Sequence, residues 1–170
     1  MLCKIRFADN KAFTLIELLV VVAIIGILAA VGVVAYNGYT GAAKAAAAKA
    51  NHNLVRSYVA SETMKCVLGE SYIMEKTIDC SAAAGATMVY NDANNMRPLI
   101  INFFEDKIKN PYTGGKGIAV NAGVPDNDNE IGEVHISPQS NPERLRFMIC
   151  FKSPCTNASN RIDETLYLPS

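Results

Sequence analysis

The sequence predicts an α+β fold in which a long N-terminal helix packs against a small antiparallel sheet, and three observations support this. Leu18–Tyr36 is an apolar run without a charged residue, close to the roughly 20 residues that cross a bilayer as a helix. The alanine-rich stretch Ala42–Ala50 has very high helix propensity. Short segments of strand character alternate with turn-rich segments over the C-terminal half. A long helix beside short antiparallel strands is an α+β arrangement.

One helix is expected from about Phe13 to about Val67, spanning about 80 Å at 1.5 Å per residue. Residues 13–40 would form the transmembrane segment or a filament core, and residues 41–67 an amphipathic segment that packs on the sheet. Gly69 is expected to end the helix. The apolar positions beyond the alanines recur at helical spacing: Leu54, Val55, Tyr58, Val59 and Cys66. Three charged residues are expected on the other faces of the helix: Lys49, Arg56 and Glu62.

Residues 68–170 are expected to form a globular head with an antiparallel sheet. A helix is predicted to start at Asn95–Pro98 with the proline in its first turn. Its apolar face would consist of Ile100, Phe103, Phe104 and Ile108. The candidate strands are Thr87–Tyr90, Lys116–Asn121, Glu133–Ser137, Leu145–Phe151 and Glu164–Leu168. Their short connections favour an antiparallel meander.

The N-terminus combines a short basic leader with a single acid in the apolar run. Residues 1–12 contain three basic residues and one acid, so this end should stay in the cytoplasm while the rest is translocated. A secretory signal would instead have its cleavage site after the apolar region. Glu17 follows this leader within the apolar run, and a carboxylate near the centre of a membrane helix costs roughly 2.5–3.5 kcal/mol. Its expected partner is an N-terminal ammonium, produced if the chain is cut just before Phe13.

The segment from Ala12 through Phe13-Thr14-Leu15-Ile16-Glu17-Leu18 to Val31 resembles the N-terminus of a type IV prepilin or a related pseudopilin. The resemblance covers about the first 28 residues of the mature chain. It implies the type IV pilin fold, cleavage between Ala12 and Phe13 by prepilin peptidase, and N-methylation of Phe13. The family usually has glycine at the position of Ala12. It also implies that Glu17 of one subunit pairs with the Phe13 ammonium of its neighbour during assembly.

The resemblance implies a structural subunit of a type IV pilus, a homo-oligomeric helical filament that serves adhesion, twitching motility or DNA uptake. Its partners would be prepilin peptidase, the assembly platform with its ATPase, and the inner membrane before assembly. The chain would be an inner-membrane precursor and then part of a cell-surface pilus, or fimbrium, with the head periplasmic or extracellular. The alternatives are a pseudopilin of a type II secretion system and a minor pilin.

Four of the five cysteines lie after the leader: Cys66, Cys80, Cys150 and Cys155. An even number in a translocated domain favours disulfides, and four cysteines allow three pairings. The local pairs Cys66–Cys80 and Cys150–Cys155 are favoured, and the second resembles the C-terminal disulfide loop of many type IV pilins. A four-thiolate metal site is the alternative, but the spacing of two residues between paired ligands is missing.

The sequence contains no catalytic motif and calls for no cofactor, so an enzyme is not expected. His52 and His135 stand apart, with His52 expected in solvent or at an interface, and Gly114–Gly117 is a turn without the full phosphate-loop pattern. The acidic run with Asp126, Asp128 and Glu130 is a weak calcium candidate, because its spacing fails the EF-hand pattern.

Nucleic-acid binding is possible but is not indicated by charge. Of the 16 Lys+Arg and 16 Asp+Glu, three and one lie in residues 1–12, which leaves 13 and 15 and a net charge near −2. The residues that could contribute to a basic patch are Lys107, Lys109, Lys116, Arg144 and Arg146.

Overall fold

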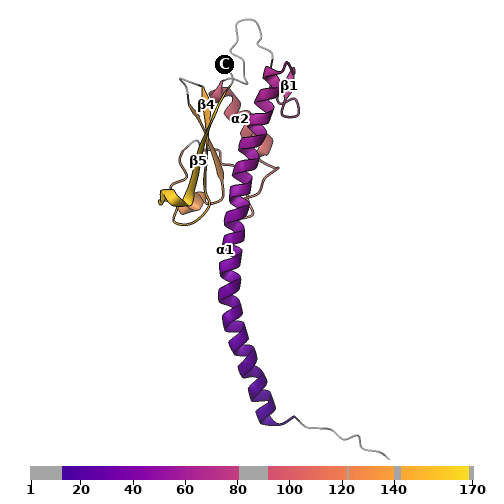
Figure 1. Ribbon diagram of the computed structural model, residues 1–170, viewed down its shortest axis with the longest axis vertical. Coiled ribbons are helices and arrows are strands. Elements are labelled where there is room, and N and C mark those ends of the chain that lie inside the picture. The colour runs from indigo at the N-terminus through magenta and orange to yellow at the C-terminus, as the bar shows by residue number, and fades with distance from the viewer. Residues whose placement is uncertain (1–12, 81–91, 122, 140–142, 169–170) are drawn as a thin grey trace, which may run out of the picture. The chain divides into compact units, whose positions relative to one another are not determined.

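The structure is a computed structural model that describes residues 13–80, 92–121, 123–139 and 143–168. The chain divides into two compact units, residues 1–40 and residues 41–170. Where it is described, the first unit is the beginning of one long helix. The second contains the rest of this helix and, among the described residues, a shorter α-helix and two antiparallel sheets (Figure 1). This arrangement confirms the predicted α+β, pilin-like fold class.

The long helix α1 runs from Leu15 to Val67, over 53 residues. The backbone N–H of Gly69 donates to the Cys66 carbonyl, and the next N–H, of Glu70, donates to the Lys65 carbonyl. Gly69 has a φ of 94°, the left-handed conformation that this Schellman motif requires. Gly69 therefore ends the helix as the sequence predicts.

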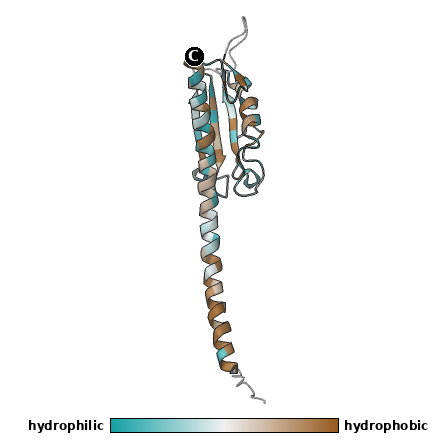
Figure 2. Ribbon diagram, turned by 90° about the vertical axis from the view of Figure 1, so that its right-hand side faces the viewer, coloured by the Kyte–Doolittle hydropathy of each residue, from teal (hydrophilic) through white to brown (hydrophobic). Residues whose placement is uncertain are grey.

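The two parts of α1 differ in composition. In Figure 2 the first part is coloured almost entirely as hydrophobic, whereas the second part is mixed. By length and composition α1 is able to cross a membrane, and the apolar window that meets this criterion is not buried within the chain. Its second part buries Ala48, Val55, Val59 and Cys66 in the core of the C-terminal unit. Leu54, which was expected on this face, is 51 % exposed, so the buried stripe is narrower than the apolar pattern.

Three polar residues of α1 are buried, Thr63 and two that the sequence did not place in the core, His52 and Glu62. His52 is fully buried, and its Nε2 atom lies 3.2 Å from the Phe147 carbonyl oxygen of the sheet. Glu62 is 5 % exposed, and its carboxylate accepts hydrogen bonds from the Met74 backbone N–H at 2.7 Å and from Lys65. Buried polar groups are tolerated where hydrogen bonds replace those to water, and a pattern of apolar positions does not reveal such partners.

The larger sheet has the strand order β3–β4–β5 and is antiparallel throughout. Its strands are β3 (Val134–Gln139), β4 (Arg144–Cys150) and β5 (Arg161–Tyr167). They correspond to the last three predicted strands, with β5 starting three residues earlier than expected. One face, which includes Leu145, Phe147 and Ile149 of β4, belongs to the hydrophobic core.

The segment predicted as strand Lys116–Asn121 is not a strand. It makes two isolated bridges, Lys109 with Lys116 and Ile118 with Val134. The Arg97 guanidinium donates to the Ile136 carbonyl at 2.7 Å and also to the Val120 carbonyl. The Ala119 N–H donates to the Val134 carbonyl, and the Val134 N–H donates to the Gly117 carbonyl. One parallel bridge and the Arg97 side chain therefore join this segment to β3, where a continuous antiparallel ladder was expected.

The second helix begins earlier than predicted. α2 extends over Ala93–Phe104, with Asp92 as its N-cap, so Pro98 lies inside the helix and outside its first turn. The Asp92 carboxylate accepts the backbone N–H groups of the second and third helical residues. Ile108 is buried in the core but lies beyond the end of α2.

The smaller sheet pairs two short strands that the sequence did not reveal, β1 (Tyr72–Ile73) and β2 (Ile78–Asp79). Two residues in each strand are too few for a periodic pattern. Two further short elements are the 3-10 helices η2 (Asp128–Glu130) and η3 (Ala158–Asn160). The predicted strand Thr87–Tyr90 lies outside the described residues.

Candidate functional site: the N-terminal segment and the disulfide loop

The start of α1 is closed by a reciprocal capping box. Glu17 Oε2 accepts hydrogen bonds from the Thr14 backbone N–H at 2.9 Å and from Thr14 Oγ1 at 2.7 Å. In return, the Glu17 N–H donates to Thr14 Oγ1 at 3.3 Å. The pattern Thr-x-x-Glu explains this geometry, because each side chain satisfies a backbone N–H that the first turn leaves without a helical partner. The sequence pattern Thr14-x-x-Glu17 is sufficient to predict this capping box.

The capping box places the only carboxylate of the apolar segment beside its N-terminal residue. The Glu17 carboxylate accepts a hydrogen bond from the backbone N–H of Thr14, the residue that follows Phe13. Phe13 itself is 82 % exposed. From Leu18 onward the large apolar side chains of the segment are each about half exposed or more, on every face of the helix. Such a surface requires a lipid or protein environment outside this fold. The described chain thus presents an apolar rod with one acid at its start.

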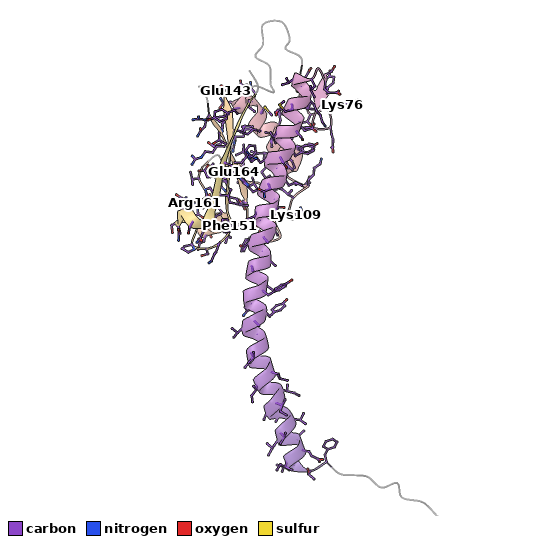
Figure 3. All side chains as sticks on the ribbon, in the orientation of Figure 1. Lys76, Lys109, Glu143, Phe151, Arg161 and Glu164 are labelled. Carbon is purple, nitrogen blue, oxygen red and sulfur yellow. A yellow bond between two sulfur atoms is a disulfide. The ribbon has the colours of Figure 1, made fainter. Side chains whose placement is uncertain are left out.

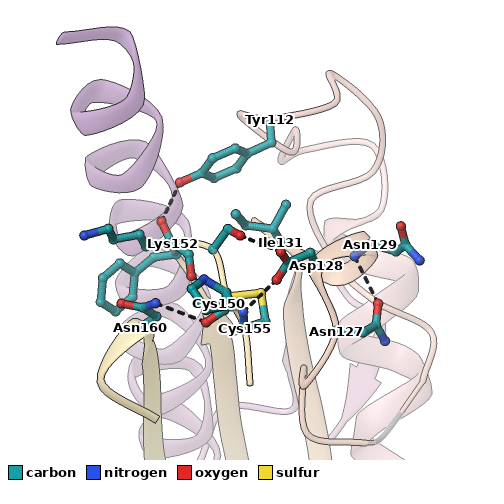
Figure 4. The surroundings of a disulfide bond; sticks show 12 residues. Tyr112, Asn127, Asp128, Asn129, Ile131, Cys150, Lys152, Cys155 and Asn160 are labelled. Carbon is teal, nitrogen blue, oxygen red and sulfur yellow. Dashed lines mark hydrogen bonds between the residues drawn. A yellow bond between two sulfur atoms is a disulfide. The ribbon is translucent and has the colours of Figure 1, made fainter. Parts of the chain in front are cut away.

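The structure joins Cys66 to Cys80 and Cys150 to Cys155, the two local pairs. The first bond connects the last turn of α1 to the residue after β2. The second closes a short loop between β4 and η3. Figure 4 shows this loop beside Tyr112, whose hydroxyl donates to the Phe151 carbonyl. A four-thiolate metal site is excluded by these bonds, since no thiolate remains among the four cysteines.

The acid at the disulfide loop is engaged in hydrogen bonds within the chain. Asp128 Oδ1 accepts the Cys155 backbone N–H at 2.7 Å, and Oδ2 accepts the Ser153 hydroxyl at 2.5 Å (Figure 4). The hydrogen bond from Ser153 and then that from Cys155 lower the pKa of Asp128 below its ordinary value. Within the described part of the chain, no three His, Cys, Asp or Glu residues are grouped so as to hold a metal ion. The geometry therefore gives no support to the calcium candidate of Asp126, Asp128 and Glu130.

The suggested basic patch is largely neutralised by local partners. Three of its five members form ion pairs, in the pairs Lys107–Glu75, Lys116–Glu105 and Arg146–Asp163. Arg144 donates to the Gln139 side chain at 2.7 Å. These contacts leave little of the concentrated positive charge that nucleic-acid binding uses.

The two histidines are buried in separate environments and do not form a catalytic group. His52 contacts the Phe147 carbonyl, as described above, while His135 of β3 is 1 % exposed. Burial lowers the pKa of His135, an effect that Glu130 partly opposes. Both side chains therefore act as core residues.

Together, the fold and the apolar first segment define a pilin-like protein. Residues 8–33 match the family model described as the prokaryotic N-terminal methylation motif. This motif is the class III signal typical of type IV pilins and pseudopilins, which are structural and non-enzymatic proteins. No curated protein and no solved structure matches the chain.

Proposed function

We propose that the chain is a structural subunit of a type IV pilus filament. The observation that carries this proposal is the first segment of α1, which is apolar on every face, exposed within the chain, and contains a single carboxylate beside the residue that cleavage would make N-terminal. A lone membrane anchor needs the apolar surface but has no use for Glu17, whose presence is expensive in a bilayer. A helix that polymerises needs both the apolar surface, to pack against other helices, and Glu17, to pair with a neighbouring subunit.

The charge chemistry of Glu17 supports a role in assembly. Cleavage between Ala12 and Phe13 creates a Phe13 amine, which stays cationic after methylation. Within one chain Glu17 is already satisfied by Thr14, so pairing with a neighbour exchanges these hydrogen bonds for a charge-assisted contact. In an apolar filament core such a contact between two opposite charges is far stronger than in water. It also neutralises both groups as the subunit leaves the membrane.

The C-terminal unit fits an exported location. Its two disulfides are stable in an oxidising compartment such as the periplasm or the cell surface. The basic leader keeps residues 1–12 on the cytoplasmic side, where prepilin peptidase acts. The precursor would therefore sit in the inner membrane until the assembly platform and its ATPase extract it into a surface filament.

The decisive experiment is non-reducing mass spectrometry of filaments sheared from cells that express this chain. We expect the dominant protein to begin at N-methylated Phe13 and to be lighter than its reduced form by two hydrogens for each disulfide. A processed chain that stays in the envelope and never enters the sheared fraction would instead identify a pseudopilin or a minor pilin. A stable protein that retains residues 1–12 would contradict the processing step.

A further inference from the structure

Large apolar side chains gather in the stretch where α1 ends. Leu68 is 82 % exposed, and Met64, Val67 and Tyr72 are 51–54 % exposed. The backbone here is fixed by the Schellman motif at Gly69 and by the nearby Cys66–Cys80 disulfide. The exposure therefore belongs to an ordered turn and not to a frayed helix end. We call these four residues the apolar knob.

A pocket of about 400 Å³ opens on the outer face of the larger sheet, away from the core. Its apolar lining includes Val124, Pro125, Met148 and Ile162, and its charged lining includes Asp126 and Arg161. Arg146, which also lines it, is held by a bidentate contact with Asp163. We call this site the β5 pocket.

The apolar knob and the β5 pocket lie toward opposite ends of the C-terminal unit. Arg161 is paired with Cys150 in the sheet, and the neighbouring Phe151 ring lies 3.9 Å from Lys49 Nζ of α1. The helix from Lys49 to Cys66 covers about 25 Å at 1.5 Å per residue. Figure 3 accordingly shows Phe151 and Arg161 toward one end of this unit and Lys76, close to the knob in sequence, at the other.

We propose that the apolar knob of one subunit docks into the β5 pocket of a second copy of the same chain. The inference rests on the proposed filament function, and it names the surfaces that join successive C-terminal units. Contacts between two different surfaces of identical subunits do not close on themselves unless the rotation allows a ring, and they otherwise generate helical filaments. A knob at one end and a pocket at the other supply that geometry.

The charges beside the two surfaces are complementary. Glu70 and Lys76 flank the knob in sequence, whereas Arg161 and Asp126 line the pocket. Among the described residues, none of these four takes part in an ion pair within the chain. Docking brings Glu70 of one subunit to Arg161 of the next, and this pairing favours a second copy over an unrelated apolar partner.

The apolar half of the contact is tested by Leu68→Asp, with Val120→Asp as the matched control. Val120 is also an exposed apolar residue, at 67 %, but it belongs to neither surface. We expect Leu68→Asp to reduce the sheared filaments by about tenfold or more, as expected for loss of a central interface side chain. The amount of processed, disulfide-bonded chain in the envelope should be unchanged, and Val120→Asp should assemble as the wild type does.

The proposed ion pair between Glu70 of one subunit and Arg161 of the next is tested by exchanging the two charges. Glu70→Lys and Arg161→Glu should each weaken assembly, and the double variant should restore it, because a coupling that appears only when both residues change reports direct contact. Failure of the double variant to recover filaments would overturn the pairing of these residues.

The docking proposal and the filament function fail in different ways. Wild-type yield in Leu68→Asp, in cells where Glu17→Ala gives no filaments, would refute the docking contact and leave the filament function intact. Absence of filaments from the wild-type chain itself would refute both.

Discussion

The first segment of α1 and the C-terminal unit differ in two respects: whether a family motif matches them, and whether their side chains are buried within the chain. Residues 13–40 contain most of the family motif matched over residues 8–33 and are almost entirely apolar, yet their large apolar side chains are exposed within the chain. Residues 41–168 match no curated protein or solved structure, yet they contain a core with buried His52, Glu62 and His135. The first region is specified for contacts with other molecules, and the second for contacts with itself. A substitution in the first region should therefore affect assembly without unfolding the protein, whereas a substitution of a buried residue in the second region should destabilise the fold.

The largest effect is expected for Glu17→Ala, which tests the first half of this comparison. The variant should be processed, because the proposed cut site is unchanged, but it should form almost no filaments, because the Phe13 ammonium loses the partner proposed for it. Thr14→Val is the control that removes only the hydroxyl of the capping box and keeps the carboxylate. It should cost the helix start about 0.5–2 kcal/mol and still assemble. Immunoblots of envelope and sheared fractions measure both results, and normal piliation of Glu17→Ala would refute the pairing role.

The next largest effect is expected from removing the disulfides of the C-terminal unit. Replacing both Cys66 and Cys80 by serine should cost about 3 kcal/mol of unfolding free energy, and replacing both Cys150 and Cys155 about 2 kcal/mol, because the first pair closes the longer loop. Thermal unfolding of the processed chains in detergent, followed by near-UV circular dichroism, measures the order. Equal losses from the two pairs would contradict the chain-entropy explanation.

A smaller effect is expected at Glu62, whose carboxylate holds the Met74 N–H. Met74 begins a run of three non-glycine residues with φ values of 51°, 56° and 68°, a conformation that L-residues rarely adopt. Glu62→Ala leaves a buried N–H without its acceptor and should cost about 1–3 kcal/mol. Glu62→Gln keeps an acceptor oxygen and should cost less. If the two variants unfold at the same temperature, the hydrogen bond to Met74 does not stabilise this turn.

The sequence predicted what depends on periodicity and on motifs, and it missed what depends on individual partners. The extent of α1, its end at Gly69 and the three strands of the larger sheet follow from local patterns. The burial of His52 could not be predicted, because its partner is a backbone carbonyl far along the chain. The segment after Lys116 has strand-like composition, but beyond its bridge to Val134 the Arg97 guanidinium binds the Ile136 and Val120 carbonyls, a contact that composition does not reveal. The capping box of Thr14 and Glu17, in contrast, was readable from the sequence.

The smallest expected effect is a pH dependence that His135 adds to the C-terminal unit alone. Burial lowers the pKa of this imidazole in the folded chain, while Glu130 opposes the shift and Arg97 adds to it. The unfolded chain therefore binds the proton first, so stability should decrease as the pH falls below about 6.5, by at most about 1.4 kcal/mol per pH unit. His135→Leu cannot titrate and should reduce the change of the unfolding temperature between pH 6.5 and 5. Glu133, whose pKa is raised by burial and by Glu130, is unchanged in this variant and contributes equally to both proteins. His52→Leu is the comparison variant, since it removes the other buried imidazole. If the pH slope persists with His135→Leu and disappears with His52→Leu, His135 is not the residue that causes it.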